Sequence, residues 1–170
     1  MTLFIDWQTL AHGPKTTIAV PVFDAGLHLV LRNDVITDAS WCVSPPAAMN
    51  CPIHGIADQV AHYFAAPDRV DLHLKLLRQG SDYARSVWQQ LLLIPAGTTL
   101  TYAELATKLG SGPRAVARAC RDNPYAGLIP CHRVVAKTGV GGFMGQRSGP
   151  FVALKQRILV FESTQHSIAS

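Results

Sequence analysis

Over its first 45 residues the chain shows short runs of β-branched and aromatic residues, a pattern typical of β-strands. The richest runs are residues 16–23, 27–31 and 35–42. Residues 24–26, Asp-Ala-Gly, favour a turn between the first two runs. The pattern therefore predicts a small sheet that contains a hairpin.

The apolar spacing then changes to that of a helix. Ile56, Val60 and Phe64 follow one another at four-residue intervals, which places them on one helical face. A proline and an aspartate shortly after Phe64 end this helix, and we expect residues 65–80 to connect to a second region. The first region is accordingly predicted as an N-terminal domain of residues 1–75.

The second region, residues 80–170, is predicted to be mostly helical because it contains three helix-start signals. Ser81 can cap a helix, Thr101 and Glu104 form a capping box, and Pro113 suits a first helical turn. The expected helices cover residues 82–93, 102–109 and 113–121. The last two are joined by a glycine-containing turn, which makes them a helix-turn-helix candidate. The expected fold class is α+β.

Composition sets two limits on these expectations. Apolar residues make up 48% of the chain and charged residues 15%, as in ordinary globular domains. No stretch approaches about 18 uninterrupted apolar residues, and the chain does not start with the basic and apolar segments of a signal peptide. We therefore expect a cytoplasmic protein with no membrane partner.

Charge is distributed unevenly along the chain. Residues 1–78 hold five Lys/Arg against seven Asp/Glu, and residues 79–170 hold ten against four, so the two parts carry net charges of −2 and +6. A basic half indicates a polyanionic partner such as nucleic acid, with chance surface charge as the alternative.

The third predicted helix of the basic half carries its arginines on one face. Arg114, Arg118 and Arg121 stand at i, i+4 and i+7. Small residues between them, such as Ala115, let a helix approach a phosphate backbone closely. The alternative is a solvated face on an alanine-rich helix.

The four cysteines are expected to be reduced thiols, because a chain of this length does not need disulfides. Cys51 and His54 have a spacing that offers two metal ligands, and Cys42 offers a third. No fourth partner stands at a characteristic spacing. We predict no metal and no small-molecule cofactor.

The most informative stretch is residues 128–135, in which apolar pairs flank Cys131, His132 and Arg133. A thiolate is the nucleophilic form of cysteine, and a neighbouring cation lowers a thiol pKa. Because side chains adjacent in an extended chain point to opposite sides, His132 needs a bend or a bridging water to reach Cys131. From the residues alone, a reactive cysteine and a buried structural cysteine remain equally open.

The sequence Pro130-Cys131-His132-Arg133, with Asn123 eight residues before the cysteine, resembles the active-site motif of the O6-alkylguanine-DNA alkyltransferase family. Further segments resemble that family at Thr101-Tyr102, Arg114-Ala115-Val116, Gly142-Phe143 and residues 155–162. The resemblance covers about residues 80–162, and the first 75 residues match in layout only. It implies a ribonuclease-H-like N-terminal sheet domain and a winged-helix-like C-terminal domain.

The resemblance also implies a function and a partner. The expected partner is double-stranded DNA that contains O6-alkylguanine. The expected reaction is the irreversible transfer of the alkyl group to Cys131, once per molecule. Extrusion of the base is implied because the reacting carbon is inaccessible within the base stack.

Roles for individual residues follow from the resemblance. In the catalytic group, Glu162 orients His132, His132 activates Cys131 through water, and Tyr102 protonates or hydrogen-bonds N3 of the leaving guanine. On the DNA side, Arg114 fills the place of the flipped nucleotide. The implied DNA-binding set is Arg114, Ala115, Arg118 and Arg121, and the implied pocket set is Asn123, Val134, Phe143 and Met144.

Several positions depart from the family pattern. Phe143 stands where tyrosine is usual, Gln146 where glycine is usual, and Arg157 where tryptophan is common. One rival is a damage sensor that binds without repairing, but that group lacks the reactive cysteine. A plain helix-turn-helix regulator and a cysteine hydrolase are the other rivals. The hydrolase is disfavoured because its nucleophile and base would be adjacent and no oxyanion-hole signature is visible.

Overall fold

The computed structural model describes residues 3–45, 54–66 and 70–168. They form a mixed α+β structure, as the sequence predicts, and it contains a five-stranded sheet. The chain divides into two compact units, one of Met1–Gln79 with Pro124–Leu128 and one of Gly80–Asn123 with Ile129–Ser170. The second unit therefore contains the predicted helical region of residues 80–170 except residues 124–128, which belong to the first unit.

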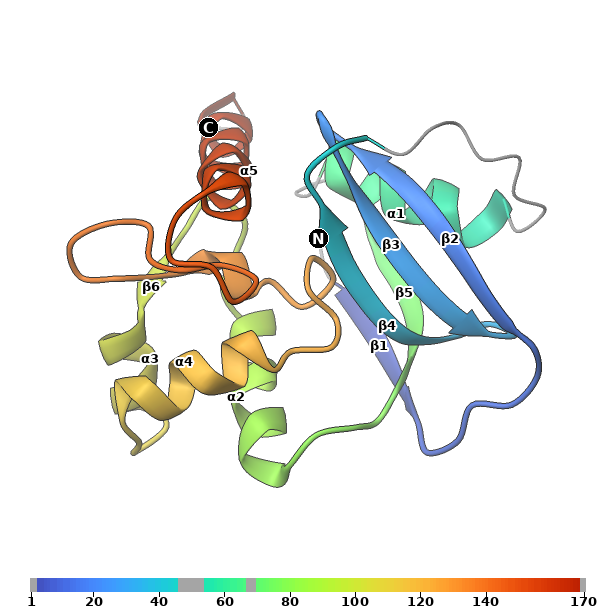
Figure 1. Cartoon of the computed structure of the whole chain (residues 1–170), viewed down its shortest axis with the longest axis horizontal. Coiled ribbons are helices and arrows are strands. Elements are labelled where there is room, and N and C mark those ends of the chain that lie inside the picture. Colours follow the sequence, from blue (N-terminus) through green and yellow to red (C-terminus); the bar gives the residue numbers. More distant parts are fainter. Residues whose placement is uncertain (1–2, 46–53, 67–69, 169–170) are drawn as a thin grey trace. The chain divides into compact units, whose positions relative to one another are not determined.

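The sheet of the first unit has the strand order β1-β5-β4-β3-β2 (Figure 1). Its strands are β1 (Leu3–Gln8), β2 (Lys15–Val22), β3 (Ala25–Arg32), β4 (Val35–Cys42) and β5 (Leu72–Leu77). Strands β2, β3 and β4 form an antiparallel meander, whereas β5 pairs in parallel with both β1 and β4. Helix α1 (His54–Ala65) packs against β2 and β5 and buries Val60, Tyr63 and Phe64.

The three predicted strands and the helix of this unit are confirmed, with shifts of one or two residues at most ends. Two strands were not predicted. The expected connection of residues 65–80 contains β5, in which buried Leu72, Leu74 and Leu76 alternate with exposed His73 and Lys75. The predicted turn is also shorter than expected, because the chain reverses at residues 23–24 and Ala25 already begins β3.

Residues 124–128 join the first unit through its sheet. The N–H of Ala39 donates to the carbonyl of Pro124 at 2.7 Å, and Tyr125 forms an isolated parallel bridge with Ala39. The side-chain amide of Gln79 donates to the Tyr125 hydroxyl at 2.8 Å, and that hydroxyl donates to the carbonyl of Leu77. This segment, which immediately precedes the Cys131 motif, is therefore held in place by the strands around it.

The second unit is built from helices and one short two-stranded sheet. Its elements are α2 (Asp82–Leu92), β6 (Leu100–Thr101), α3 (Tyr102–Lys108), α4 (Pro113–Arg121), η1 (Cys131–Arg133), β7 (Val134–Val135) and α5 (Pro150–Ile168). Strands β6 and β7 pair in parallel. The sequence signals for the helix starts are confirmed: Ser81 caps α2, Thr101 and Glu104 form the capping box of α3, and Pro113 begins α4.

Helices α2, α3 and α4 share one core. Val87, Leu91, Leu105 and Val116 are fully buried, and the indole N–H of Trp88 donates to the carbonyl of Ala119 at 2.9 Å. This bond ties α2 to α4 and satisfies a polar group that is otherwise costly to bury. Helices α3 and α4 also pack against each other, and the short segment of residues 109–112 joins them.

Candidate active site

The Cys131 motif is a sharp bend rather than an extended segment. Pro130, with φ −79° and ψ 64°, is the centre of an inverse γ-turn in which the N–H of Cys131 donates to the carbonyl of Ile129 at 2.8 Å. The next three residues, Cys131 to Arg133, form a single 3₁₀ turn. The backbone therefore bends at the motif, and all three polar side chains are buried.

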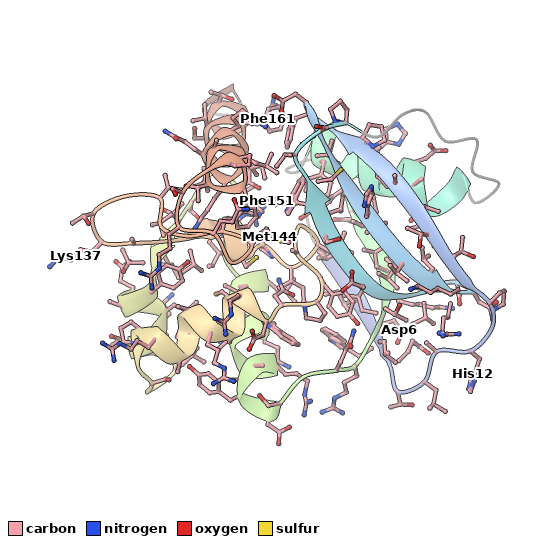
Figure 2. All side chains as sticks on the ribbon, viewed as in Figure 1. Asp6, His12, Lys137, Met144, Phe151 and Phe161 are labelled. Atoms are coloured by element: carbon pink, nitrogen blue, oxygen red, sulfur yellow. The ribbon has the colours of Figure 1, made fainter. Side chains whose placement is uncertain are left out.

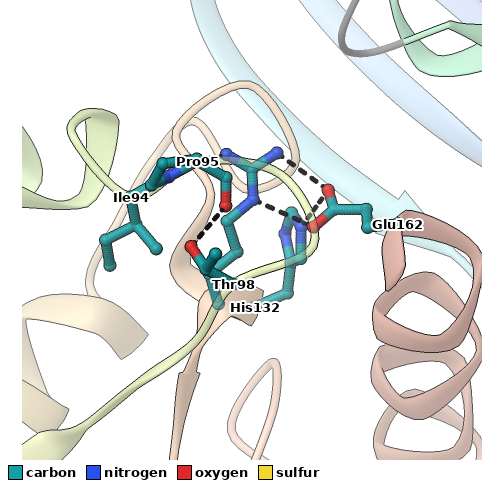
Figure 3. Close-up of polar contacts among 6 residues, drawn as sticks. Ile94, Pro95, Thr98, His132 and Glu162 are labelled. Carbon is teal, nitrogen blue, oxygen red and sulfur yellow. Dashed lines mark hydrogen bonds and ion pairs between the residues drawn. The ribbon is translucent and has the colours of Figure 1, made fainter. Parts of the chain in front are cut away.

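His132 is held by Glu162 from helix α5. Its Nε2 lies 3.0 Å from Oε1 of Glu162, and the two side chains are 1% and 4% exposed (Figure 3). Because a carboxylate only accepts hydrogen bonds, Nε2 carries the proton and Nδ1 carries the lone pair. Within the described part of the chain, Nδ1 is buried and has no hydrogen-bond partner. This nitrogen is therefore free to accept a proton, as in a catalytic triad.

Arg133 forms the second link to Glu162. Its Nε donates to Oε2 at 3.0 Å, its Nη2 donates to Oε1 at 2.8 Å, and its Nη1 donates to the carbonyl of Ile94 at 2.6 Å (Figure 3). Burial alone would raise the pKa of Glu162, but His132 and Arg133 outweigh it and hold that pKa well below its usual range. The guanidinium thus neutralises the glutamate that orients the histidine.

Cys131 is buried, with 6% of the residue exposed. Burial raises its pKa, and a hydrogen bond with Asn123 and the charge of Lys155 oppose that rise without cancelling it. The opposing effects are smaller than that of burial, so the net pKa of this thiol lies above its ordinary value in the free protein. Arg133 is engaged with Glu162, and desolvation of the thiolate dominates. The resting thiol is neutral and depends on a base to become a nucleophile.

Asn123 lies where the chain leaves the second unit, and Ile129 where it re-enters. The Asn123 amide donates to the carbonyl of Ile129 at 3.1 Å. The same side chain contacts the Cys131 thiol. Asn123, at the end of α4, therefore fixes the start of the bend that carries the cysteine.

Lys155 is a site residue whose chemistry the sequence reasoning missed. It is fully buried, and its Nζ donates to the carbonyls of Val134 at 2.7 Å and Gly142 at 3.1 Å. The same nitrogen lies 5.9 Å from the ring centroids of both Tyr102 and Phe143. Lysine side chains are usually exposed in folded proteins, so burial of this one was not expected. Its position could have been inferred from the spacing, because Lys155 stands seven residues before Glu162 and therefore on the same face of a helix.

The loop before α5 closes on itself at residues 143–146. Phe143 and Gln146 exchange backbone hydrogen bonds of 2.9 Å in both directions, and Met144 and Gly145 between them have φ values of 50° and 77°. This geometry is that of a type I′ turn. A Cβ on Gly142 would lie 2.8 Å from the carbonyl oxygen of Gln146, so the turn requires a glycine before Phe143. Phe143 is buried, and Met144 is half-buried at the turn.

Tyr102 begins helix α3 and is partly buried. Burial raises the pKa of its phenol, and the nearby thiols of Cys120 and Cys131 raise it further. The phenol consequently stays protonated and can serve as a hydrogen-bond donor. Its two thiol neighbours place it in the same cluster as the Cys131 side chain.

Helix α4 divides into a buried face and a charged face. Val116, Ala119 and Cys120 are buried. The exposed side carries Arg114, Ala115, Arg118 and Arg121. Two of these arginines pair with Asp122, Arg118 at 3.6 Å and Arg121 at 3.3 Å. The stripe of arginines is thus displayed at the surface, as its spacing predicts.

The described residues contain no group of three His, Cys, Asp or Glu side chains that could hold a metal ion. The side chains of Cys51 and His54, which the sequence offered as candidate ligands, are not among the part of the chain that the structure describes. No helix in this part of the chain is long and apolar enough to cross a membrane.

Comparison with known proteins agrees with this geometry. Residues 82–164 match the family described as "6-O-methylguanine DNA methyltransferase, DNA binding domain". The chain is 39% identical over 120 residues to a "Probable methylated-DNA--protein-cysteine methyltransferase" of Acanthamoeba polyphaga mimivirus, which covers 69% of this chain and 80% of that protein. It is 35% identical over 152 residues to the methylated-DNA--protein-cysteine methyltransferase of Methanothermobacter thermautotrophicus, with 88% and 81% covered.

Solved structures give the same result. The Mycobacterium tuberculosis O6-methylguanine methyltransferase superposes with a TM-score of 0.70 at 27% identity, over 89% of this chain and 94% of that one. The OGT of the same organism in complex with DNA gives 0.66 at 29% identity, over 86% and 92%. The fold and site define a mixed α+β protein with a buried cysteine beside a glutamate-held histidine. The chain belongs to the methylated-DNA--protein-cysteine methyltransferase family.

Proposed function

We propose that this protein repairs DNA by transferring the alkyl group from O6 of guanine to Sγ of Cys131, once per molecule. The observation that carries the proposal is the buried Cys131 thiol beside His132, whose Nε2 is held by Glu162 while Nδ1 is free. Family membership supplies the substrate class, because the relatives are named for action on methylated DNA.

The reaction begins with the thiol proton. His132 Nδ1 accepts it, through a water molecule, and Glu162 stabilises the resulting imidazolium. The Cys131 thiolate then attacks the alkyl carbon, so the S–C bond forms as the C–O6 bond breaks. Tyr102 donates a hydrogen bond or its proton to N3 of the departing guanine. If the proton is transferred, guanine leaves neutral and the Tyr102 phenolate regains a proton from solvent; with the hydrogen bond alone, guanine leaves as an anion that solvent protonates. In both cases the His132 imidazolium gives up the thiol proton to solvent. Atoms and charges balance without a cofactor.

The DNA-binding surface is assigned to helices α3 and α4, acting as a helix-turn-helix within a winged-helix-like domain. Arg114 fills the space of the flipped nucleotide, and Ala115 permits close approach in the minor groove. Arg118 and Arg121 contact phosphates, for which their exposure is suited. The complex of the Mycobacterium tuberculosis relative with DNA supports DNA as the partner.

The pocket for the extruded base is assigned to Asn123, Val134, Phe143 and Met144. Phe143 is buried and offers a ring for stacking. The Val134 carbonyl, which accepts from Lys155 at 2.7 Å, is assigned to the exocyclic amine of guanine as well, because a carbonyl oxygen can accept two hydrogen bonds. The Met144 N–H is assigned to O6. The ribonuclease-H-like character of the sheet domain, the division at residues 75–80 and the cytoplasmic location stay predictions.

The test is an intact mass measurement after mixing the protein with duplex DNA that contains one O6-methylguanine. We expect a gain of one methyl group on the peptide that carries Cys131, saturating at one per protein and absent in Cys131→Ser. The alternative function is a damage sensor that binds the lesion without repairing it. Lesion-specific binding without a mass gain would establish that alternative and contradict the proposal.

A further inference from the structure

The segment that leads into helix α4 has little side-chain packing of its own. Helix α3 ends in a Schellman motif, in which the N–H of Ser111 donates to the carbonyl of Ala106 at 2.9 Å. The N–H of Gly110, whose φ is 59°, donates to the carbonyl of Thr107 at 3.2 Å. Gly112 then caps α4 without a side-chain hydrogen bond. A Cβ on Gly110 or Gly112 would meet no atom outside the adjoining residues within 4 Å, so both glycines face open space.

A hydrogen bond to helix α2 fastens this segment. The hydroxyl oxygens of Ser111 and Tyr83 lie 2.7 Å apart, which is the usual length of an O–H···O bond. Tyr83 is the second residue of α2 and is 36% exposed, whereas Ser111 is half-buried. Because the two glycines beside it carry no side chain, Ser111 supplies the side-chain attachment of residues 110–112. Its partner stands 28 residues earlier in the chain, on a different helix.

The opposite end of α4 is fastened to the same helix. The indole N–H of Trp88 donates to the carbonyl of Ala119 at 2.9 Å, and α2 and α4 pack against each other (Figure 2). Helix α2 therefore holds α4 near both ends, and the attachment at the beginning lies three residues before Arg114. Because Pro113 between them has a fixed φ, a shift of Ser111 is passed on to Arg114.

We propose that Tyr83 is a positioning residue for base extrusion: through its hydrogen bond to Ser111 it fixes the start of α4, and with it the place of Arg114. This role rests on the proposed function, in which Arg114 fills the space of the flipped nucleotide. Extruding a base costs stacking and pairing energy. An arginine on a helix start that can shift would give way instead of replacing the base in the stack. Neither hydroxyl takes part in the alkyl transfer itself.

The test compares Tyr83→Phe and Ser111→Ala, which each remove one hydroxyl of the pair, with Ser86→Ala. Ser86 is the matched control, because its hydroxyl lies on the same helix and donates to the backbone carbonyl of Tyr83 at 2.7 Å. Methyl transfer to Cys131 is followed by intact mass from two donors: duplex DNA that contains O6-methylguanine, and the free nucleoside O6-methyl-2′-deoxyguanosine, which needs no extrusion.

We expect Tyr83→Phe and Ser111→Ala each to slow transfer from the duplex by about three- to tenfold, the effect of one lost hydrogen bond, and to leave transfer from the nucleoside unchanged. Ser86→Ala should match the unsubstituted protein with both donors. The double variant should be no slower than either single one, because the two hydroxyls act as a pair. Ser111→Thr keeps the hydroxyl and should retain the duplex rate. Equal slowing with both donors, or losses that add in the double variant, would overturn the role.

Extrusion is also measured without any transfer, in the Cys131→Ser background. A 2-aminopurine placed beside the O6-methylguanine becomes more fluorescent when its neighbour leaves the stack. At saturating protein, Tyr83→Phe should lower this rise about threefold, and an undiminished rise would contradict the positioning role. If the unsubstituted protein extrudes the base but transfers no methyl group, the proposed function fails, whereas the role of Tyr83 is still decided by this fluorescence.

Discussion

The pairing of Glu162 with Arg133 predicts a large and pH-dependent effect of a nearly isosteric substitution. Glu162→Gln keeps the shape of the side chain but removes the charge that Arg133 meets through contacts of 2.8 and 3.0 Å. Arg133 is only 5% exposed, so its guanidinium would stay buried after losing its carboxylate partner. Breaking a buried pair in this way costs about 3–5 kcal/mol, a large part of the roughly 5–15 kcal/mol that stabilises a domain.

The assay is urea unfolding followed by circular dichroism at several pH values. The folded pKa of Glu162 lies below its ordinary value of 4.5, so the charge stabilises the protein fully above about pH 4.5 and progressively less as the pH falls below it. The difference between Glu162→Gln and the unsubstituted protein should therefore be largest at pH 7 and shrink in acid.

Two comparisons make this prediction specific. Asp122→Asn in the same unit removes an exposed carboxylate that pairs with arginine at 3.3 Å, and it should change stability by no more than about 0.5 kcal/mol. The double variant Glu162→Gln/Arg133→Met removes both charges and should recover much of the loss. A loss below about 1 kcal/mol in Glu162→Gln, or a loss that does not change with pH, would refute the assigned role of the buried pair.

Single contacts of the second unit also have measurable consequences. Asn123→Ala removes the hydrogen bond that opposes the raised pKa of Cys131, so iodoacetamide should modify that thiol more slowly at pH 7.5, whereas an equal rate would contradict the contact. Thr101→Ala removes the capping box of α3 and should cost about 1 kcal/mol in urea unfolding. Replacing Arg118 and Arg121 by Gln should reduce the salt dependence of DNA binding by about two phosphate contacts, and an unchanged slope would place these side chains off the DNA.

The sequence predicted best the elements whose signals are local. The capping box at Thr101, the N-cap at Ser81 and the proline start of α4 each fix a helix end through one or two side chains, so neighbouring residues suffice to find them. Strand β5 had an equally clear alternation over Leu72, Leu74 and Leu76. This strand was missed because the whole of residues 65–80 was interpreted as a connection between the two regions, although the alternation is visible in the sequence.

The arrangement within the site could be predicted only in part. The resemblance implied that Glu162 orients His132, and the structure brings these residues together at 3.0 Å. The bidentate pairing of Arg133 with the same carboxylate could not be read from the sequence, because it depends on the bend at residues 131–133. Lys155 was missed because burial of a lysine depends on acceptors supplied by residues far along the chain. Its acceptors lie in β7 and in the loop before α5.

The neutral resting state of Cys131 should protect this cysteine, which can accept an alkyl group only once, from reaction before the substrate binds. Oxidants and small electrophiles attack thiolates, so a buried neutral thiol resists them. Cys42 is half-buried and Cys131 is buried, so at pH 7.5 a small excess of iodoacetamide should modify Cys42 before Cys131, as peptide mass will show. Faster modification of Cys131 would mean that its thiolate is already populated in the free protein, in which case the base at His132 would no longer be needed to generate the nucleophile.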